Sequence, residues 1–165
     1  MDKKALLIDH EACWGCRTCE VACKQENQVP YGVKLIYLTE ERPGKGYLDF
    51  FYRVHLCWHC EDPPCIDACP EGAIVKRDDG IVLLQEENCS GCGACQDSCP
   101  YGAIEFDEEK DTVRKCNLCH HRIDKGLIPA CADNICPAHC IYFGDSKEIE
   151  KHLEDKKRAR DRANK

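Results

Sequence analysis

Two runs in the first third of the chain are rich in the β-branched and aromatic residues that favour β-strands. They cover residues 33–38 and 47–54. Between them stands Arg42-Pro43-Gly44-Lys45-Gly46, in which proline and glycine favour a turn. We therefore predict a β-hairpin within an insert over residues 31–55.

A second pattern is a repeat, in which a cysteine is followed by proline and then by a short apolar run. Residues 69–74, 99–104 and 136–141 align position for position in this way. Upstream, residues 8–13 match residues 84–89, where a strand end leads to the first cysteine of a group. The repeated unit is strand, loop, short helix, strand, which predicts an α+β fold.

The C-terminal residues 146–165 are predicted to form a charged helix or tail. Asp145 and Glu148 have the spacing of a capping box, and Ile149 and Leu153 fall on one helical face. The cationic residues near the end form either a solvated helix end or a docking patch; they include Lys157, Arg158, Arg160 and Arg162.

Composition changes the picture, because 17 of the 165 residues are cysteine and only one is methionine. The hydrophobic fraction of 43% includes these cysteines, which leaves a thin supply of aliphatic residues for a core. Cross-linking through sulfur must therefore help to hold the fold.

The net charge and the chain's N-terminus limit the possible environments. A formal charge of −7 argues against nucleic acid as a partner. Residues 1–9 contain neither an export signal nor twin arginines, and no segment approaches a membrane span, so we expect a cytoplasmic protein without direct membrane insertion. These features and the odd cysteine count also disfavour a disulfide framework.

The spacing of the cysteines indicates the metal. Three thiolates at three-residue intervals can bind three irons of one cubane, while a fourth, followed by proline, reaches a different cluster, as in bacterial ferredoxins. A zinc-binding structural module remains the non-redox alternative, although zinc ribbons use only separated pairs of cysteines. The four groups are Cys13, Cys16, Cys19 and Cys23; Cys57, Cys60, Cys65 and Cys69; Cys89, Cys92, Cys95 and Cys99; and Cys116, Cys119, Cys131, Cys136 and Cys140.

The fourth group has one cysteine too many, and the repeat suggests which one is extra. Cys136 aligns with the proline-capped Cys69 and Cys99, whereas Cys140 aligns with Ala73 and Ala103. We therefore predict that Cys136 is a ligand and that Cys140 is not. Sixteen cysteines then remain for four 4Fe-4S clusters.

The order of the groups resembles one family. Residues 13–27, 57–65 and 115–119 carry the resemblance, which extends from about Leu7 to Asp145. The family comprises the four-cluster iron–sulfur subunits of the dimethyl sulfoxide reductase and formate dehydrogenase type. It implies two interleaved two-cluster ferredoxin-like folds within residues 1–145, one formed by 5–23 with 110–145 and the other by 55–109.

The resemblance also implies ligand sets that join different groups. Four residues separate Cys131 from Cys136, where the family usually has three. This departure concerns the assignment of Cys136 to the first of the sets below. The implied sets are Cys13, Cys16, Cys19 and Cys136; Cys116, Cys119, Cys131 and Cys23; Cys57, Cys60, Cys65 and Cys99; and Cys89, Cys92, Cys95 and Cys69.

A molybdo- or tungstopterin catalytic subunit is the partner that the resemblance implies, with a further electron donor or acceptor protein possible. In its short length, the chain resembles the electron-transfer subunits of tungsten enzymes of the aldehyde oxidoreductase and benzoyl-CoA reductase type. No catalytic constellation stands out, and His59, His120 and His121 are expected to pack or donate to sulfur. A free-standing polyferredoxin would carry the same motifs.

Overall fold

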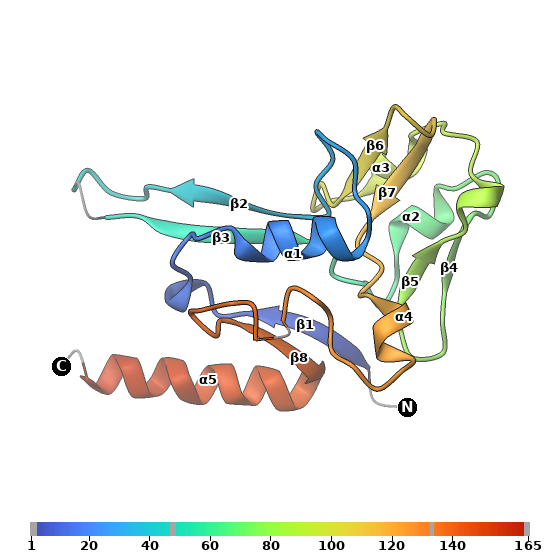
Figure 1. Cartoon of the computed structure of the whole chain (residues 1–165). Helices are drawn as coiled ribbons and strands as arrows, with labels where there is room; N and C mark the ends of the chain where they lie inside the picture. Colours follow the sequence, from blue (N-terminus) through green and yellow to red (C-terminus); the bar gives the residue numbers. More distant parts are fainter. Residues whose placement is uncertain (1–2, 47–48, 133, 164–165) are drawn as a thin grey trace.

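The chain forms a mixed α+β fold, which we describe from a computed structural model covering residues 3–46, 49–132 and 134–163 (Figure 1). In these residues the strands make four separate two-stranded sheets, connected by short helices. Within the same residues, no helix combines the length and the apolar composition that crossing a membrane requires.

The predicted hairpin consists of β2 (Ile36–Glu41) and β3 (Phe51–Leu56), which pair antiparallel and extend from the body of the molecule (Figure 1). Alternate residues are buried, with Ile36 opposite Leu56 and Leu38 opposite Val54, so one face of the ribbon packs on the core. β2 begins three residues later than the sequence predicted, and residues 47–48, where the second run begins, lie outside the described residues.

The middle of the chain contains the repeated unit twice. β4 (Ile74–Lys76) pairs with β5 (Val82–Leu84), and β6 (Ile104–Asp107) pairs with β7 (Thr112–Lys115). Each sheet follows a short helix, α2 (Pro64–Asp67) or α3 (Ala94–Ser98), and the turn η2 (Glu86–Asn88) leads from β5 toward α3. Their inward side chains form a small core of Ile74, Val82, Ile104, Val113, Cys65 and Cys95.

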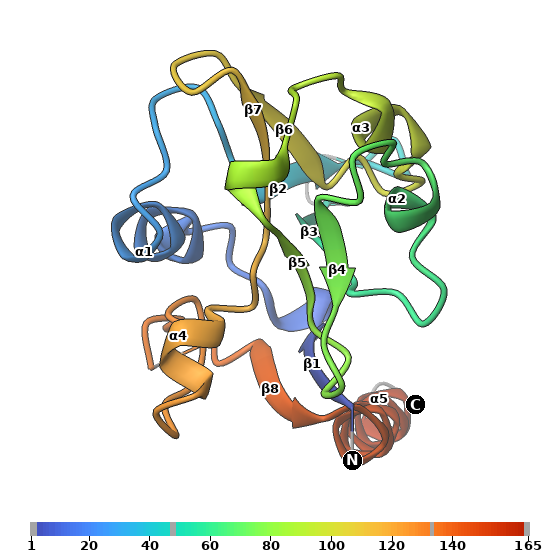
Figure 2. The same cartoon turned by 90° about the vertical axis from the view of Figure 1, so that its right-hand side faces the viewer.

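The remaining sheet joins a strand from the start of the chain to one that follows Cys140. β1 (Lys4–Ile8) pairs antiparallel with β8 (Ile141–Asp145), and the two strands lie side by side (Figure 2). The turn η1 (His10–Ala12), α1 (Thr18–Glu26) and α4 (His120–Ile123) complete this half. Its core combines aliphatic side chains with Cys19, Cys23, Cys131, Cys136 and Cys140.

The C-terminal helix α5 (Ser146–Ala163) begins where the sequence predicted a cap. The Asp145 Oδ1 atom accepts the N–H groups of Lys147 and Glu148, each at 3.1 Å, which satisfies two free donors of the first turn. Ile149 is buried under the helix. The helix therefore packs along the β1–β8 sheet (Figure 1).

A buried carboxylate fixes the far end of α5. Asp9 accepts both terminal nitrogens of Arg160, at 2.8 and 2.5 Å, and pairs with Lys156 at 2.8 Å. Arg160 also bonds Glu11 at 2.9 Å. Arg160, one of the cations in the predicted solvated end or docking patch, is thus engaged within the molecule.

Replacing Arg160 should loosen α5. Arg160→Met removes the bidentate partner of a buried carboxylate, and because Arg160 itself is one-third exposed, we expect a loss of about 1–2 kcal/mol. Amide hydrogen exchange in α5 should then be roughly five- to thirtyfold faster. Arg158→Met, which removes only surface pairs with Glu154 and Asp155, is the control. Equal exchange in the two variants would contradict the anchoring role.

The same anchor predicts a pH dependence. The hydrogen bond from Arg160 holds the pKa of Asp9 well below its usual range. The contribution of this carboxylate to stability is therefore complete above the ordinary aspartate pKa of about 4 and is lost as the pH falls toward the lowered value. The protection of the α5 amides, measured relative to their intrinsic exchange rate at each pH, should accordingly fall on acidification and stay constant above that pKa.

Candidate metal centres

Three cavities are each lined by four cysteines. The Cys57 cavity, the Cys23 cavity and the Cys69 cavity contain about 350, 320 and 280 Å³ of space not filled by protein atoms. Each takes three cysteines from one sequence group and one from another. Their cysteines are, in that order, Cys57, Cys60, Cys65 and Cys99; Cys23, Cys116, Cys119 and Cys131; and Cys69, Cys89, Cys92 and Cys95.

These cysteines are not arranged around a single ion. In the described parts of the chain, no three His, Cys, Asp or Glu side chains converge on a point suited to one metal ion. Ligands that bind different irons of one cubane stand farther apart than the ligands of one ion. A cavity with a thiol on several sides and an apolar wall therefore fits a cubane.

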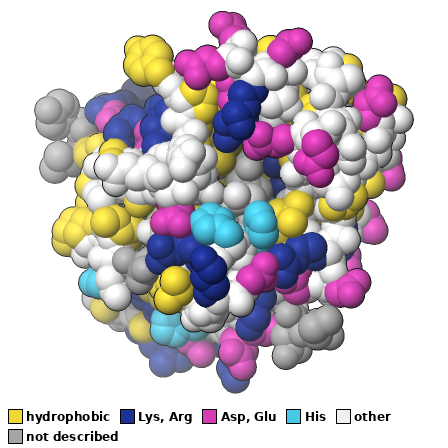
Figure 3. Space-filling model, turned by 45° about the vertical axis from the view of Figure 1, so that its right-hand side comes forward, with side chains coloured by type: hydrophobic (Ala, Val, Ile, Leu, Met, Phe, Trp, Pro, Cys, Tyr) yellow, Lys and Arg dark blue, Asp and Glu magenta, His cyan; other side chains and the backbone are white. Residues whose placement is uncertain are grey.

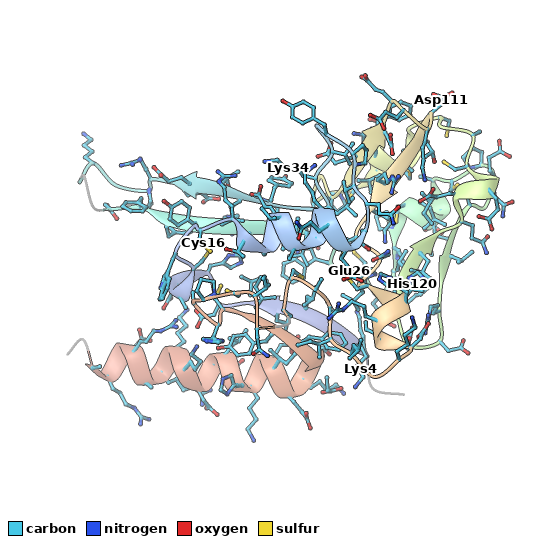
Figure 4. All side chains as sticks on the ribbon, in the orientation of Figure 1. Lys4, Cys16, Glu26, Lys34, Asp111 and His120 are labelled. Carbon is cyan, nitrogen blue, oxygen red and sulfur yellow. The ribbon has the colours of Figure 1, made fainter. Side chains whose placement is uncertain are left out.

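The remaining five cysteines form the Cys13 group, which we define as Cys13, Cys16, Cys19, Cys136 and Cys140. Burial, together with the neighbouring Cys13 and Cys136, raises the pKa of Cys19 to about 12. The Sγ atoms of Cys136 and Cys140 are 3.5 Å apart, and both side chains are buried. Cys16 is exposed in the loop before α1 (Figure 4). Both candidates of the fourth sequence group thus reach this site.

The loops that carry the cysteines turn sharply through left-handed backbone. Gly91 has φ +71°, and a Cβ atom there would lie 2.5 Å from the Asp111 carbonyl oxygen, so this turn requires glycine. Arg17, His59 and Cys119 adopt positive φ in the other loops. Such turns direct successive backbone N–H groups to one side, where they can meet anionic sulfur.

Backbone donors do reach several cysteine sulfurs. The N–H groups of Ala73 and Ala103 lie 3.3 and 3.4 Å from the Sγ atoms of Cys69 and Cys99, the same relation in both repeats. The Leu118 N–H lies 3.4 Å from the Cys116 Sγ atom. Hydrogen bonds of this kind stabilise a thiolate and adjust the potential of an iron–sulfur centre.

A side-chain donor that the sequence analysis missed serves the Cys23 cavity. The Asn27 Nδ2 atom lies 3.6 Å from the sulfurs of both Cys23 and Cys119. Asn27 follows Cys23 by four residues, one helical turn, which is a signal that could have identified it. Burial raises the pKa of Cys23 to about 12, so iron must supply the positive charge that keeps its thiolate form.

Two buried basic side chains stand beside the Cys57 cavity, and both line it. The Nδ1 atom of His59 accepts a hydrogen bond from the Val82 N–H at 2.9 Å. The pKa of this imidazole lies well below its usual range, mainly because the ring is buried and secondly because the Lys115 charge is nearby. Lys115 donates to the carbonyl oxygens of Val82 and Cys116 at 2.5 and 2.9 Å. Sequence analysis did not identify Lys115.

An ion-pair cluster ties α1 to α4 beside the Cys23 cavity. Glu26 bonds His121 at 2.7 Å and Arg122 at 2.9 Å, and Glu26 and His120 face the space between the two helices (Figure 4). A surface hollow lined by Glu26, His120 and His121 lies next to these residues, and histidine side chains are visible near the middle of the face in Figure 3. Cys23 on α1 and Cys119 at the start of α4 are therefore fixed by the same tie.

Comparison with known proteins agrees with these centres. Two family models described as "4Fe-4S dicluster domain" match residues 48–146 and 12–74, and together they imply four 4Fe-4S clusters. A subunit of the anaerobic dimethyl sulfoxide reductase of Escherichia coli is 38% identical over 154 residues, 88% of this chain and 75% of that protein. The predicted resemblance to this type of subunit is confirmed.

Two further relatives are longer than this chain. A subunit of the tetrathionate reductase of Salmonella typhimurium is 38% identical over 147 residues, 87% of this chain and 58% of that protein. The iron–sulfur subunit of the nitrate-inducible formate dehydrogenase of Escherichia coli is 37% identical over 163 residues, 88% of this chain and 55% of that protein. The chain thus spans little more than half the length of these two relatives.

The α1–α4 tie should control how firmly the Cys23 cavity retains iron. Glu26→Gln removes the carboxylate that pairs with Arg122 and is hydrogen-bonded to His121, which costs about 0.5–1.5 kcal/mol at this partly exposed site. Iron release to a chelator should become roughly two- to tenfold faster for about a quarter of the iron. The exposed Glu154→Gln is the control, and equal release rates in both variants would refute this role.

The tie also has a defined pH response. The hydrogen bond from His121 lowers the pKa of Glu26, so its stabilising contribution is present above the ordinary glutamate pKa of about 4.3 and fades on acidification. The difference in iron release between Glu26→Gln and the unmodified chain should therefore be largest at neutral pH and shrink in acid.

Proposed function

The chain belongs to the family of 4Fe-4S dicluster iron–sulfur proteins, and from this premise we propose that it is the electron-transfer subunit of a molybdenum- or tungsten-pterin oxidoreductase. Proteins of this family transfer electrons through their clusters. The observation that carries the proposal is the set of three cavities, each lined by four cysteines from two distant segments.

We propose that each ligand set joins two groups, as the family resemblance implies. The lining of the three cavities supports the three sets that they contain. For the Cys13 group, the proposed ligands are Cys13, Cys16, Cys19 and Cys136. Two interleaved halves follow within residues 1–145: one combines 5–23 with 110–145, the other comprises 55–109, and 146–165 is a charged appendage.

A 4Fe-4S cluster supplies a centre that accepts and releases one electron when it is bound. The residues of this chain hold the irons through thiolates, and backbone amides donate to the sulfurs. Apolar side chains such as Ile104 and Leu118 enclose the cavities and exclude water. By fixing distances and environments, the protein determines where an electron rests and how readily it moves.

The chemistry of a substrate belongs, on this proposal, to a partner. The relatives are named as subunits of a dimethyl sulfoxide reductase, a tetrathionate reductase and a formate dehydrogenase, which supports a separate catalytic subunit. A further electron donor or acceptor would complete the path. The tungsten enzymes of the aldehyde oxidoreductase or benzoyl-CoA reductase type are the narrower proposal for the complex.

Anaerobic purification of the native protein tests this function. We expect about 16 irons per chain, and we expect a larger subunit that contains molybdenum or tungsten to co-elute. A monodisperse monomer with the full iron content would instead indicate a free-standing polyferredoxin. Zinc in place of iron would refute the electron-transfer function altogether.

The Cys13 group provides a second test, because two cysteines compete for one position. Cys136→Ala should lose or convert one cluster and leave about 12–15 irons per chain, whereas Cys140→Ala should retain all four because Ala73 and Ala103 occupy the aligned positions. Iron analysis and paramagnetic resonance of the reduced variants measure this. A deficit only in Cys140→Ala would reverse the assignment, and a deficit in neither would show that the two thiols can replace one another.

A further inference from the structure

We propose that Lys115 and His59 give the cluster of the Cys57 cavity the highest reduction potential of the four. The inference rests on the proposed function, since it requires a 4Fe-4S cluster held by the four cysteines of that cavity. Two buried basic residues would then determine which of the four clusters is reduced first.

Lys115 is a buried cation without an anionic partner of its own. Only 5% of the residue is exposed, and within the described residues its ammonium group bonds two carbonyl oxygens but no carboxylate. A buried charge is costly unless an opposite charge compensates for it. A cluster with four thiolate ligands is anionic and gains a further negative charge on reduction. Because Lys115 lines the cavity, its charge stabilises the reduced form more than the oxidised form.

His59 contributes a hydrogen-bond donor to the same cavity. Its Nδ1 atom accepts the Val82 N–H, so the proton of the neutral ring is on Nε2. That Nε2 atom is buried and has no hydrogen-bond partner in the described residues, and the residue is 2% exposed. Because His59 lines the cavity, we assign a sulfur atom of the cluster as the acceptor of this orphan donor, and hydrogen bonds to cluster sulfur raise the potential.

The other three centres lack such a pair in their described surroundings. The lining of the Cys69 cavity includes Glu71 but no Lys, Arg or His, and that of the Cys23 cavity includes the neutral Asn27 but none of these cations either. In the Cys13 group, the carboxylate of Glu20 acts on Cys19 and is itself paired with Arg17 and Lys34 at 2.9 and 3.2 Å. These two cations are compensated by Glu20 and are 51% and 41% exposed, so water screens their charge, unlike that of the buried Lys115. None of the three centres thus has an uncompensated buried cation in its described surroundings, and we expect lower potentials for them.

Lys115 also has a second, weaker influence. Its ammonium group donates to the carbonyl oxygen of Cys116, whose thiol lines the Cys23 cavity. The charge thus lies between the two cavities, and its removal should lower both potentials, with the larger change at the Cys57 cavity.

The test is a potentiometric titration of the full chain, purified anaerobically, followed by paramagnetic resonance. Cys99→Ser identifies the signal of the Cys57 cavity as the one lost or converted. Lys115→Met should then decrease the reduction equilibrium constant of that signal about tenfold, which equals 59 mV for a one-electron couple. Lys115→Arg, which retains the charge, should restore most of the potential.

Two more variants separate charge from structure. Lys110→Met removes one positive charge from the exposed β6–β7 turn and should leave the Cys57 signal unchanged. His59→Asn tolerates the left-handed backbone at φ +46° while withdrawing the imidazole, and it should lower the same signal. Iron analysis of each variant ensures that four clusters are present.

The outcomes distinguish the inference from the function on which it rests. The inference fails if the chain holds four iron clusters but the Cys57 signal is not the highest in potential. It also fails if Lys115→Met shifts that signal no more than Lys110→Met does. The proposed function itself fails if the purified chain contains no iron–sulfur clusters.

Discussion

Cysteine occupies the interior positions that aliphatic residues hold in most domains, and the rest of the fold depends on this substitution. Both hydrophobic cores of the described residues include cysteines, and five of them lie in the larger core. Without metal, buried thiols do not cross-link the chain. Burial also raises their pKa, so that the thiolate form is energetically costly. Iron reverses that cost, because ligation releases the proton and joins segments that are far apart in sequence. Iron ligation therefore contributes directly to the stability of the fold.

Polar contacts then position the helix α1, which carries two of the cysteines. Glu20 is buried, accepts the Leu38 N–H at 2.9 Å and pairs with Lys34, so it connects α1 to the hairpin. Glu26 connects the other end of α1 to α4. Because α1 carries Cys19 and Cys23, these two carboxylates determine the orientation of two different centres. The mixed α+β chain lacks a large sheet within its described residues, and these ties replace the rigidity that such a sheet would supply.

Sequence predicts the features that depend on local spacing. The cysteine groups, the two runs that form the hairpin strands, the strands that follow the proline-capped cysteines and the cap at Asp145 each rest on residues within a few positions of one another. Features that depend on distant contacts could not be predicted. Nothing near Lys115 indicates that its ammonium group would meet the Val82 carbonyl oxygen, 33 residues away. Asp9 and Arg160 are 151 residues apart, and only the closure of β1 on β8 brings them together.

With the ligand sets proposed above, the four centres follow one order along the molecule. Cys65 belongs to the Cys57 cavity and Cys69 to the Cys69 cavity, and both are on or next to α2. Lys115 lines the Cys57 cavity and the next residue, Cys116, lines the Cys23 cavity. On α1, Cys19 belongs to the Cys13 group and Cys23 to the Cys23 cavity, one helical turn apart. Each step between neighbouring centres thus passes through a single short segment. Given the proposed ligands, an electron that enters at either end must pass the Cys57 and Cys23 cavities in turn, and the Lys115 charge lies at the step that joins the two halves of the chain.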